Sequence, residues 1–186
     1  MDNDVSAGSG ITTVVGRLAL GVTLLAFGLG YTEVIDGVSA ADAVSIAQYV
    51  GGIALFVAGL MALRDHDAAN GTAFVTLGAL WFTWAVSAEG SANAHGLFLL
   101  LFALVALSLT LAGGDQLGQG AYGLFFVALV LMAVADFAGS GGLAKVGGWF
   151  AVGAGAVAWY AATAALAHWP SVLPRRAAGR GVTATG

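Results

Sequence analysis

The sequence predicts an all-α integral membrane protein in which six transmembrane helices form a channel-like bundle. The chain of 186 residues is 59% hydrophobic and only 9% charged, whereas a soluble domain carries roughly 25% charged residues. Its apolar runs approach the roughly 20 residues that a helix needs to cross a bilayer. These runs lack the polar alternation of a membrane β-strand, and a helix satisfies its own backbone hydrogen bonds in lipid.

The predicted helical domain occupies residues 11–170. The preceding segment 1–10, MDNDVSAGSG, is acidic and rich in small residues and lacks the basic start of a signal peptide, so we predict a disordered tail. Pro170 and Pro174 favour an end to the last helix. Residues 171–186 form a predicted basic C-terminal tail.

Clusters of Gly, Asp, Asn and Ser separate the apolar runs, and these residue types mark helix ends. TEVIDGVSAAD follows the first run, RDHDAAN the second, AEGSANA the third, AGGDQ the fourth and GSGG the fifth. The runs predict helices over residues 11–30, 43–63, 71–87, 95–111, 118–137 and 143–169.

Basic residues predict the orientation of the chain, because they stay preferentially in the cytoplasm. Four arginines follow the second and sixth predicted helices: Arg64, Arg175, Arg176 and Arg180. We therefore predict a multi-pass protein of the cell membrane with both termini in the cytoplasm. Lys145 is the exception, and we expect it at the opposite face beside Asp136, Glu89 and Glu33.

Small residues recur at helical spacing among the 29 glycines and many alanines of the chain. Small residues four positions apart let two helix backbones approach closely. Two interpretations remain open, since such faces either pack within one bundle or join protomers. The two series are Gly147, Ala151 and Gly155, and Ala54, Ala58 and Ala62.

Composition and motifs exclude several classes of protein. Cysteine is absent, which removes disulfides and thiolate metal sites, and the net charge of −4 argues against nucleic acid as a partner. No nucleophile motif, phosphate-binding loop or pair of carboxylates points to an enzyme or a cofactor. His66 lies between Asp65 and Asp67 in a tight loop, which favours a solvated turn over a metal site.

The predicted helices carry no Asp, Glu, Lys or His near their centres. A charge there costs about 2.5 to 3.5 kcal/mol on the insertion scale, and membrane proteins keep one mainly for function. This pattern argues against an ion-coupled pump and against a retinal protein, which needs a buried lysine. Arg17 comes nearest to an exception, but it lies in the first turns and can extend toward the interface.

Hydroxyl side chains form a narrow stripe on the third predicted helix, at Thr72, Thr76, Thr83 and Ser87. They fall within about 60° of one another at 100° per residue. Such hydroxyls suit a pore without fixed charge, where they donate to a passing carboxylate or urea oxygen. The alternative is that they bond back to carbonyls of their own helix, and both interpretations remain open.

The tryptophans are expected at two depths in the predicted bundle, and His95 near its surface. Trp149 and Trp169 suit anchoring at the membrane interface, whereas Trp81 and Trp84 are expected to fill space between helices. His95 lies at the start of a predicted helix, where an interfacial position is expected rather than a metal ligand.

Residues 49–84, YVGGIALFVAGLMALRDHDAANGTAFVTLGALWFTW, resemble the acetate uptake transporter family of YaaH/SatP-like proteins. The segments GGIAL, AGL, GTAF and LGALWF stand in the order of that family and at nearly its spacing. The last predicted helix, GGWFAVGAGAVAWYAATAAL followed by SVLP, is similar as well. The resemblance covers about residues 15–174.

The resemblance implies a pore through each protomer, with a gate that the family builds from Phe, Tyr and Leu on three helices. The corresponding positions here are Leu20, Leu77 and Ala128, and Leu55 replaces a Gln of the second helix. This gate is apolar and lacks the tyrosine hydroxyl. The family signature of Asn-Pro-x-Pro-Leu-Gly type reads ITTVVGR here, in which only Gly16 survives.

By resemblance, we expect a homo-oligomer of six chains in a lipid bilayer that transports acetate, a similar small monocarboxylate or succinate. The solute would pass the apolar constriction at Leu20, Leu77 and Ala128, with or without a proton, and hydroxyls such as Thr76 would replace part of its hydration. Two alternatives remain open. One is a channel for urea, ammonia or short amides, and the other is a membrane scaffold that transports nothing.

Overall fold

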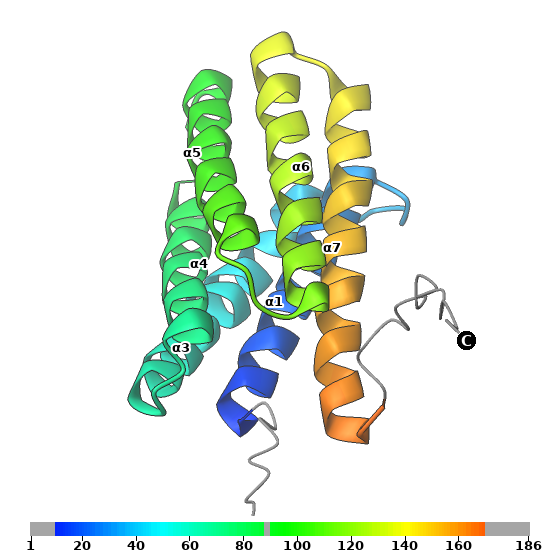
Figure 1. Cartoon of the computed structure of the whole chain (residues 1–186). Coiled ribbons are helices and arrows are strands. Elements are labelled where there is room, and N and C mark those ends of the chain that lie inside the picture. The colour runs from blue at the N-terminus through cyan, green and yellow to red at the C-terminus, as the bar shows by residue number, and fades with distance from the viewer. Residues whose placement is uncertain (1–9, 88–89, 170–186) are drawn as a thin grey trace, which may run out of the picture.

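The computed structural model of the chain describes residues 10–87 and 90–169, and every regular element in this part is helical. Figure 1 shows helices that run up and down beside one another. The prediction of six helices is confirmed, since the stretch from Ala40 to Arg64 forms one continuous rod of four pieces. The elements are α1 (Ile11–Thr32), η1 (Ala40–Ala43), α2 (Val44–Ile46), η2 (Ala47–Ala54), α3 (Leu55–Arg64), α4 (Ala68–Val86), α5 (Ala92–Leu111), α6 (Gln116–Ala138) and α7 (Gly141–Ala167).

Five of the six rods are long and apolar enough to cross a membrane: α1, Ala40–Arg64, α5, α6 and α7. The sixth, α4, has 19 residues and no charge. It is not among the five spans that are apolar enough, and it carries Asn70, two glycines, three threonines and two tryptophans. Its neighbours in the bundle are α3 and η2, so it belongs to the same layer of packed helices.

Short polar side chains set four of the helix starts. The carboxylate or hydroxyl oxygen of Asp67, Ser91, Asp115 and Ser140 accepts a hydrogen bond from a backbone N–H three residues later. Such caps satisfy one of the backbone donors that a helix leaves free at its start. The helices therefore begin two or three residues earlier than the apolar runs predict.

The second rod departs from the predicted regular helix. It opens as a 3₁₀ turn and then widens into a π-helix over Ala47–Ala54 before it continues as α3. Gly51 and Gly52 lie inside this π segment and lack side chains. A Cβ on Gly51 would lie 2.5 Å from the Cγ2 of Thr23, and one on Gly52 would lie 3.0 Å from the Cβ of Phe82. The two glycines thus let the widened segment pack directly against α1 and α4.

Small residues let α7 pack closely against its neighbouring helices inside the bundle. A Cβ on Gly155 would lie 2.9 Å from the carbonyl oxygen of Gly21, and one on Gly147 would lie 3.0 Å from the carbonyl oxygen of Ala128. Ala151 is fully buried between these positions. The first interpretation, packing within one bundle, therefore holds for this series. In the other series, Ala58 and Ala62 are buried and Ala54 is exposed.

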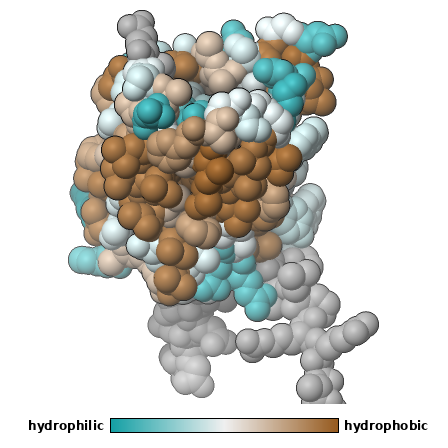
Figure 2. Space-filling view, turned by 90° about the horizontal axis from the view of Figure 1, so that it is seen from above, coloured by the Kyte–Doolittle hydropathy of each residue, from teal (hydrophilic) through white to brown (hydrophobic). Residues whose placement is uncertain are grey.

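Apolar side chains also cover the outside of the bundle. Lipid tails are as apolar as leucine, so the exposed apolar side chains along the helices suit a bilayer. Figure 2 looks down on one end of the bundle and shows hydrophobic residues across its middle, with hydrophilic ones toward the margins. Large exposed examples are Ile53, Phe56, Leu60, Leu97, Leu100, Leu101, Leu104, Val134 and Phe150.

Both ends of the helical domain lie at the same end of the bundle, where α1 begins and α7 ends (Figure 1). We call this the terminal end and the other the opposite end. Because the number of rods is even, the first and the last residue of the domain lie at the same end. Several predicted features lie outside the described residues: the tails at 1–9 and 171–186, Glu89, Pro170, Pro174, Arg175, Arg176 and Arg180.

Candidate functional site

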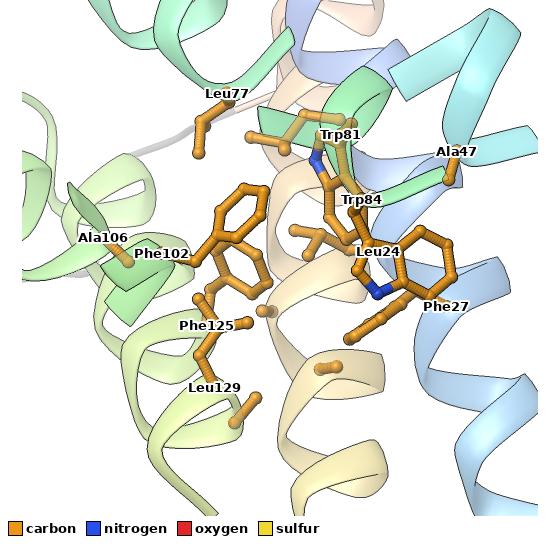
Figure 3. Close-up of a cluster of buried hydrophobic side chains, with 14 of the residues drawn as sticks. Leu24, Phe27, Ala47, Leu77, Trp81, Trp84, Phe102, Ala106, Phe125 and Leu129 are labelled. Atoms are coloured by element: carbon orange, nitrogen blue, oxygen red, sulfur yellow. The ribbon is translucent and has the colours of Figure 1, made fainter. Parts of the chain in front are cut away.

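Aromatic side chains fill the space between four helices. The backbone of α4 comes close to the backbones of α1 and α5 at only a few points. Large side chains therefore fill the space between these helices. Figure 3 shows them pointing toward one another from these elements. We call this set the aromatic cluster: Phe27 of α1, Trp81 and Trp84 of α4, Phe102 of α5 and Phe125 of α6.

Trp81 lies at the centre of the aromatic cluster. Its ring stacks on Phe125 with centroids 5.6 Å apart, and it meets Phe27 and Trp84 edge-on at 5.1 and 6.0 Å. Each such pair contributes about 0.5 to 1.5 kcal/mol beyond its buried area. The expectation that Trp81 and Trp84 fill space between helices is confirmed, since they are 2% and 3% exposed.

The aromatic cluster closes this part of the bundle to water. A gap remains among its rings and the side chains of Leu99 and Leu129, but it has no room for a water molecule. A solute that followed this axis would therefore displace at least one ring.

The four predicted apolar site residues all lie in the same buried core as the aromatic cluster. Leu20, Leu55, Leu77 and Ala128 are each at most 3% exposed. Figure 3 places Leu77 near Phe102 on the α4 side of the cluster. The structure thus brings these residues together from α1, α3, α4 and α6, and their role in a gate remains a prediction.

The threonine stripe lies on the outside of the single chain. The apolar face of α4 with Leu77 and Trp81 turns inward, which leaves Thr72 and Thr83 exposed and Thr76 half-buried. Thr76 donates to the carbonyl oxygen of Thr72 at 2.7 Å, and Thr83 donates to that of Ala79 at 2.8 Å. The second interpretation of this stripe, hydrogen bonding back to the same helix, describes both hydroxyls.

A buried hydroxyl that sequence reasoning missed lies beside the aromatic cluster. Thr23 is 1% exposed and donates to the carbonyl oxygen of Ala19 at 2.8 Å. Gly51 packs against both Thr23 and Trp81, because a Cβ there would lie 2.9 Å from the Oγ1 of Thr23 and 3.0 Å from the Cγ of the Trp81 indole. The hydroxyl hydrogen of Thr23 is used in this bond to its own helix. Its oxygen can still accept a hydrogen bond.

A polar vestibule opens at the terminal end, below the apolar core. It is a cavity of about 140 Å³ lined by Arg17, Asn70, Asp115, Gln119 and Tyr122. Leu20 also lines it, so the vestibule reaches the predicted gate. Arg17 forms an ion pair with Asp115 across from α1 to the start of α6, which holds the arginine in the vestibule.

The turn before α4 ties the vestibule to the start of α1. The hydroxyl of Thr12 donates to Asp65 at 2.8 Å, and that of Thr13 donates to Asp67 at 3.0 Å. Burial raises the pKa of Asp67, but hydrogen bonds from Asn70 and Thr13 and the charge of Arg17 outweigh it and hold this pKa below its usual 3.8. The carboxylate therefore stays ionised and keeps the turn in place.

The opposite end holds a hydrogen-bonded chain that the sequence did not suggest. The Nε1 of Trp84 donates to the Nε2 of His95 at 2.9 Å, and the Nδ1 of His95 lies 2.6 Å from a carboxylate oxygen of Asp136. An indole nitrogen only donates, so the Nε2 accepts and the proton sits on Nδ1. Lys145 pairs with Glu33 at 2.8 Å, as expected, whereas Asp136, the other expected neighbour among the described residues, pairs with His95.

Comparisons with known proteins agree with this architecture. The sequence model of the GPR1/FUN34/yaaH family matches residues 9–172. The chain shares its fold with the solved structure of the bacterial acetate channel SatP, with a TM-score of 0.77 and 22% identity. That alignment covers 88% of this chain and 97% of the other.

A curated relative is the ammonia transport outward protein 2 of Saccharomyces cerevisiae (strain ATCC 204508 / S288c). It is 26% identical over 141 residues, which cover 67% of this chain and 50% of that protein. The chain thus spans about half the length of the curated relative it matches. Together, these matches confirm the resemblance predicted from residues 49–84 and from the last helix.

Proposed function

Because this chain belongs to the GPR1/FUN34/yaaH family, we propose that it is a channel-like transporter that passes acetate or a similar small monocarboxylate across a membrane. One observation supports the proposal: an uncharged core of buried aromatic and leucine side chains lies between two polar ends of the bundle.

The proposed route begins in the vestibule at the terminal end. The guanidinium of Arg17 attracts an anion, and the paired Asp115 keeps that attraction shallow enough for release. The solute then passes the apolar positions Leu20, Leu77 and Ala128 and the aromatic cluster. It leaves at the opposite end near Asp136 and its histidine partner.

Charge limits which form of the solute crosses the constriction. Transfer of an unpaired carboxylate into an apolar site is far more costly than transfer of a neutral group. Acetate is mostly ionised at neutral pH, so either a proton accompanies it or a polar group of the protein receives it. Succinate, with a second carboxyl group, pays this cost twice.

We also propose the cell membrane as the location, cytoplasmic termini and a ring of six chains. The resemblance to the family supports the ring, and Arg64 at the terminal end supports the orientation. Proteins of this kind transport rather than catalyse, so we propose no enzymatic activity. No cofactor is needed for passive passage through such a constriction.

Ammonia is the second candidate solute. The curated yeast relative is named for ammonia transport, and a neutral constriction suits ammonia as well as it suits a protonated acid. Urea and short amides are neutral too and are tested in the same way. A scaffold that transports nothing is the third alternative.

Reconstitution in liposomes tests the proposal. Acetic acid and ammonia both cross lipid unaided, so each rate is compared with that of protein-free liposomes and its saturation is measured. We expect saturable uptake of labelled acetate above the protein-free rate. Ammonia or urea flux without acetate flux would support the second candidate, and no flux of any solute would support the scaffold.

A further inference from the structure

We propose that the indole N–H of Trp81 is the hydrogen-bond donor that receives a carboxyl oxygen inside the constriction. This inference rests on the proposed function and names the atom that binds the solute. Trp81 lies on α4 at the centre of the aromatic cluster, stacked on Phe125. Sequence reasoning assigned it only the filling of space.

The Nε1 of Trp81 is fully buried and has no hydrogen-bond partner among the described residues. Folded proteins pair most of their buried donors, and a donor left unpaired loses its hydration without compensation. The gap beside Trp81 has no room for water, so solvent does not supply a partner. An unpaired donor that persists at the centre of a route is therefore best explained by a partner that passes through.

Trp84, one turn further along α4, is the internal comparison. Its Nε1 donates to His95 at 2.9 Å, so this helix pairs an indole where its neighbours provide an acceptor. The side chains that pack on the ring of Trp81 include those of Phe27, Phe102 and Phe125, which provide no acceptor. In Figure 3 the nitrogen of Trp81 lies on the side of its ring that faces Leu77 and Phe102.

The surroundings of Trp81 define the chemical class of the ligand. The site offers one neutral donor and no charge, which suits an oxygen lone pair on a small solute rather than a cation. The nearby Thr23 has already given its hydrogen to Ala19, so it is free to accept the O–H of a protonated acid. A monocarboxylic acid has one acceptor and one donor on a small apolar body, and it matches both groups.

Replacement of Trp81 by phenylalanine removes the donor and keeps an aromatic ring. We expect the acetate concentration at half-maximal flux to rise about 2- to 12-fold, as the loss of one neutral hydrogen bond predicts. Trp159→Phe is the matched control, because it removes an exposed indole from α7 and should leave flux unchanged. Should Trp81→Phe fail to fold, 3-benzothienylalanine at position 81 replaces the N–H by sulfur at nearly the same size.

Indole ¹⁵N NMR of the intact protein in nanodiscs distinguishes binding from a structural role. Acetate would not shift the N–H resonance of Trp81 if this side chain only filled space. The chain has five tryptophans, and we expect sodium acetate to shift the N–H resonance that Trp81→Phe removes. If the wild-type protein carries acetate while that resonance and the half-maximal concentration stay unchanged, the inference is overturned and the proposed function stands. If the wild-type protein carries no acetate above protein-free liposomes, the proposed function itself fails.

Discussion

Replacement of Phe125 by alanine removes the ring that stacks on Trp81, and it tests whether the aromatic cluster is the barrier to transport. Phe125 is 1% exposed, so its loss leaves a cavity next to a gap that is now too small for water. We expect the variant to admit solute more readily and to be less stable than the wild-type protein.

The expected loss of stability follows from the environment of the ring. Helices that separate in a bilayer remain in an apolar solvent, so the transfer from water contributes little and the cavity dominates. A loss of on the order of 100 Å³ at about 24 cal/mol per Å³ gives about 2 kcal/mol. The stacked pair adds about 0.5 to 1.5 kcal/mol, for an expected decrease of about 3 kcal/mol in the free energy of unfolding.

The expected change in flux follows from the same pair. If the Trp81–Phe125 stack must separate for a solute to pass, its removal lowers the barrier by about 0.5 to 1.5 kcal/mol and raises acetate flux about 2- to 10-fold. Denaturant titration in detergent measures the stability, and liposome uptake measures the flux. Phe150→Ala is the control, since Phe150 faces outward from α7. A folded Phe125→Ala protein with wild-type flux would show that the cluster is not the barrier.

Three further variants test other parts of the bundle. Leu77→Tyr should change acetate flux without loss of assembly, as uptake and size-exclusion chromatography would show; unchanged flux removes Leu77 from the gate. His95→Ala should lower the free energy of unfolding by about 1 to 3 kcal/mol, because the indole of Trp84 and the carboxylate of Asp136 both lose a partner. His95→Gln should recover part of this free energy. An equal loss of stability in the two variants would contradict the assignment. Asp67, whose pKa is lowered, should add stability at neutral pH that is lost as the pH falls through its folded pKa, so Asp67→Asn should flatten the acid limb of a stability profile recorded below about pH 5.

The sequence predicts the helices well because their boundaries depend on local chemistry. Apolar runs of sufficient length form helices in lipid, and residues such as Asp115 and Ser140 then cap their starts. The π segment at Ala47–Ala54 escapes prediction, although two consecutive glycines inside a helical pattern are a signal for irregular backbone. Its form depends on how closely α1 and α4 pack against Gly51 and Gly52, which is not a local property.

Which face of a helix points inward is much harder to predict in a membrane protein. In water, the apolar face of a helix turns inward, but here both lipid and bundle interior are apolar. Hydropathy therefore does not decide whether the threonine stripe or the aromatic face of α4 points inward. In the structure the large rings occupy the interior. The chain from Trp84 through His95 to Asp136 joins residues that are 11 and 41 positions apart, so no local pattern reveals it.

On the proposed function, the distribution of polar groups along the route explains how a closed bundle can still conduct. A fixed charge among the rings would bind an anion and hold it, whereas a wholly apolar constriction would reject it. A single neutral donor such as the Trp81 N–H lies between these limits, because it partly replaces the hydration of a carboxyl group without trapping it. The ion pair of Arg17 and Asp115 and the chain at His95 keep the charges at the two ends. On the proposed route, movement of rings about Trp81, rather than movement of charged groups, would determine when the solute passes.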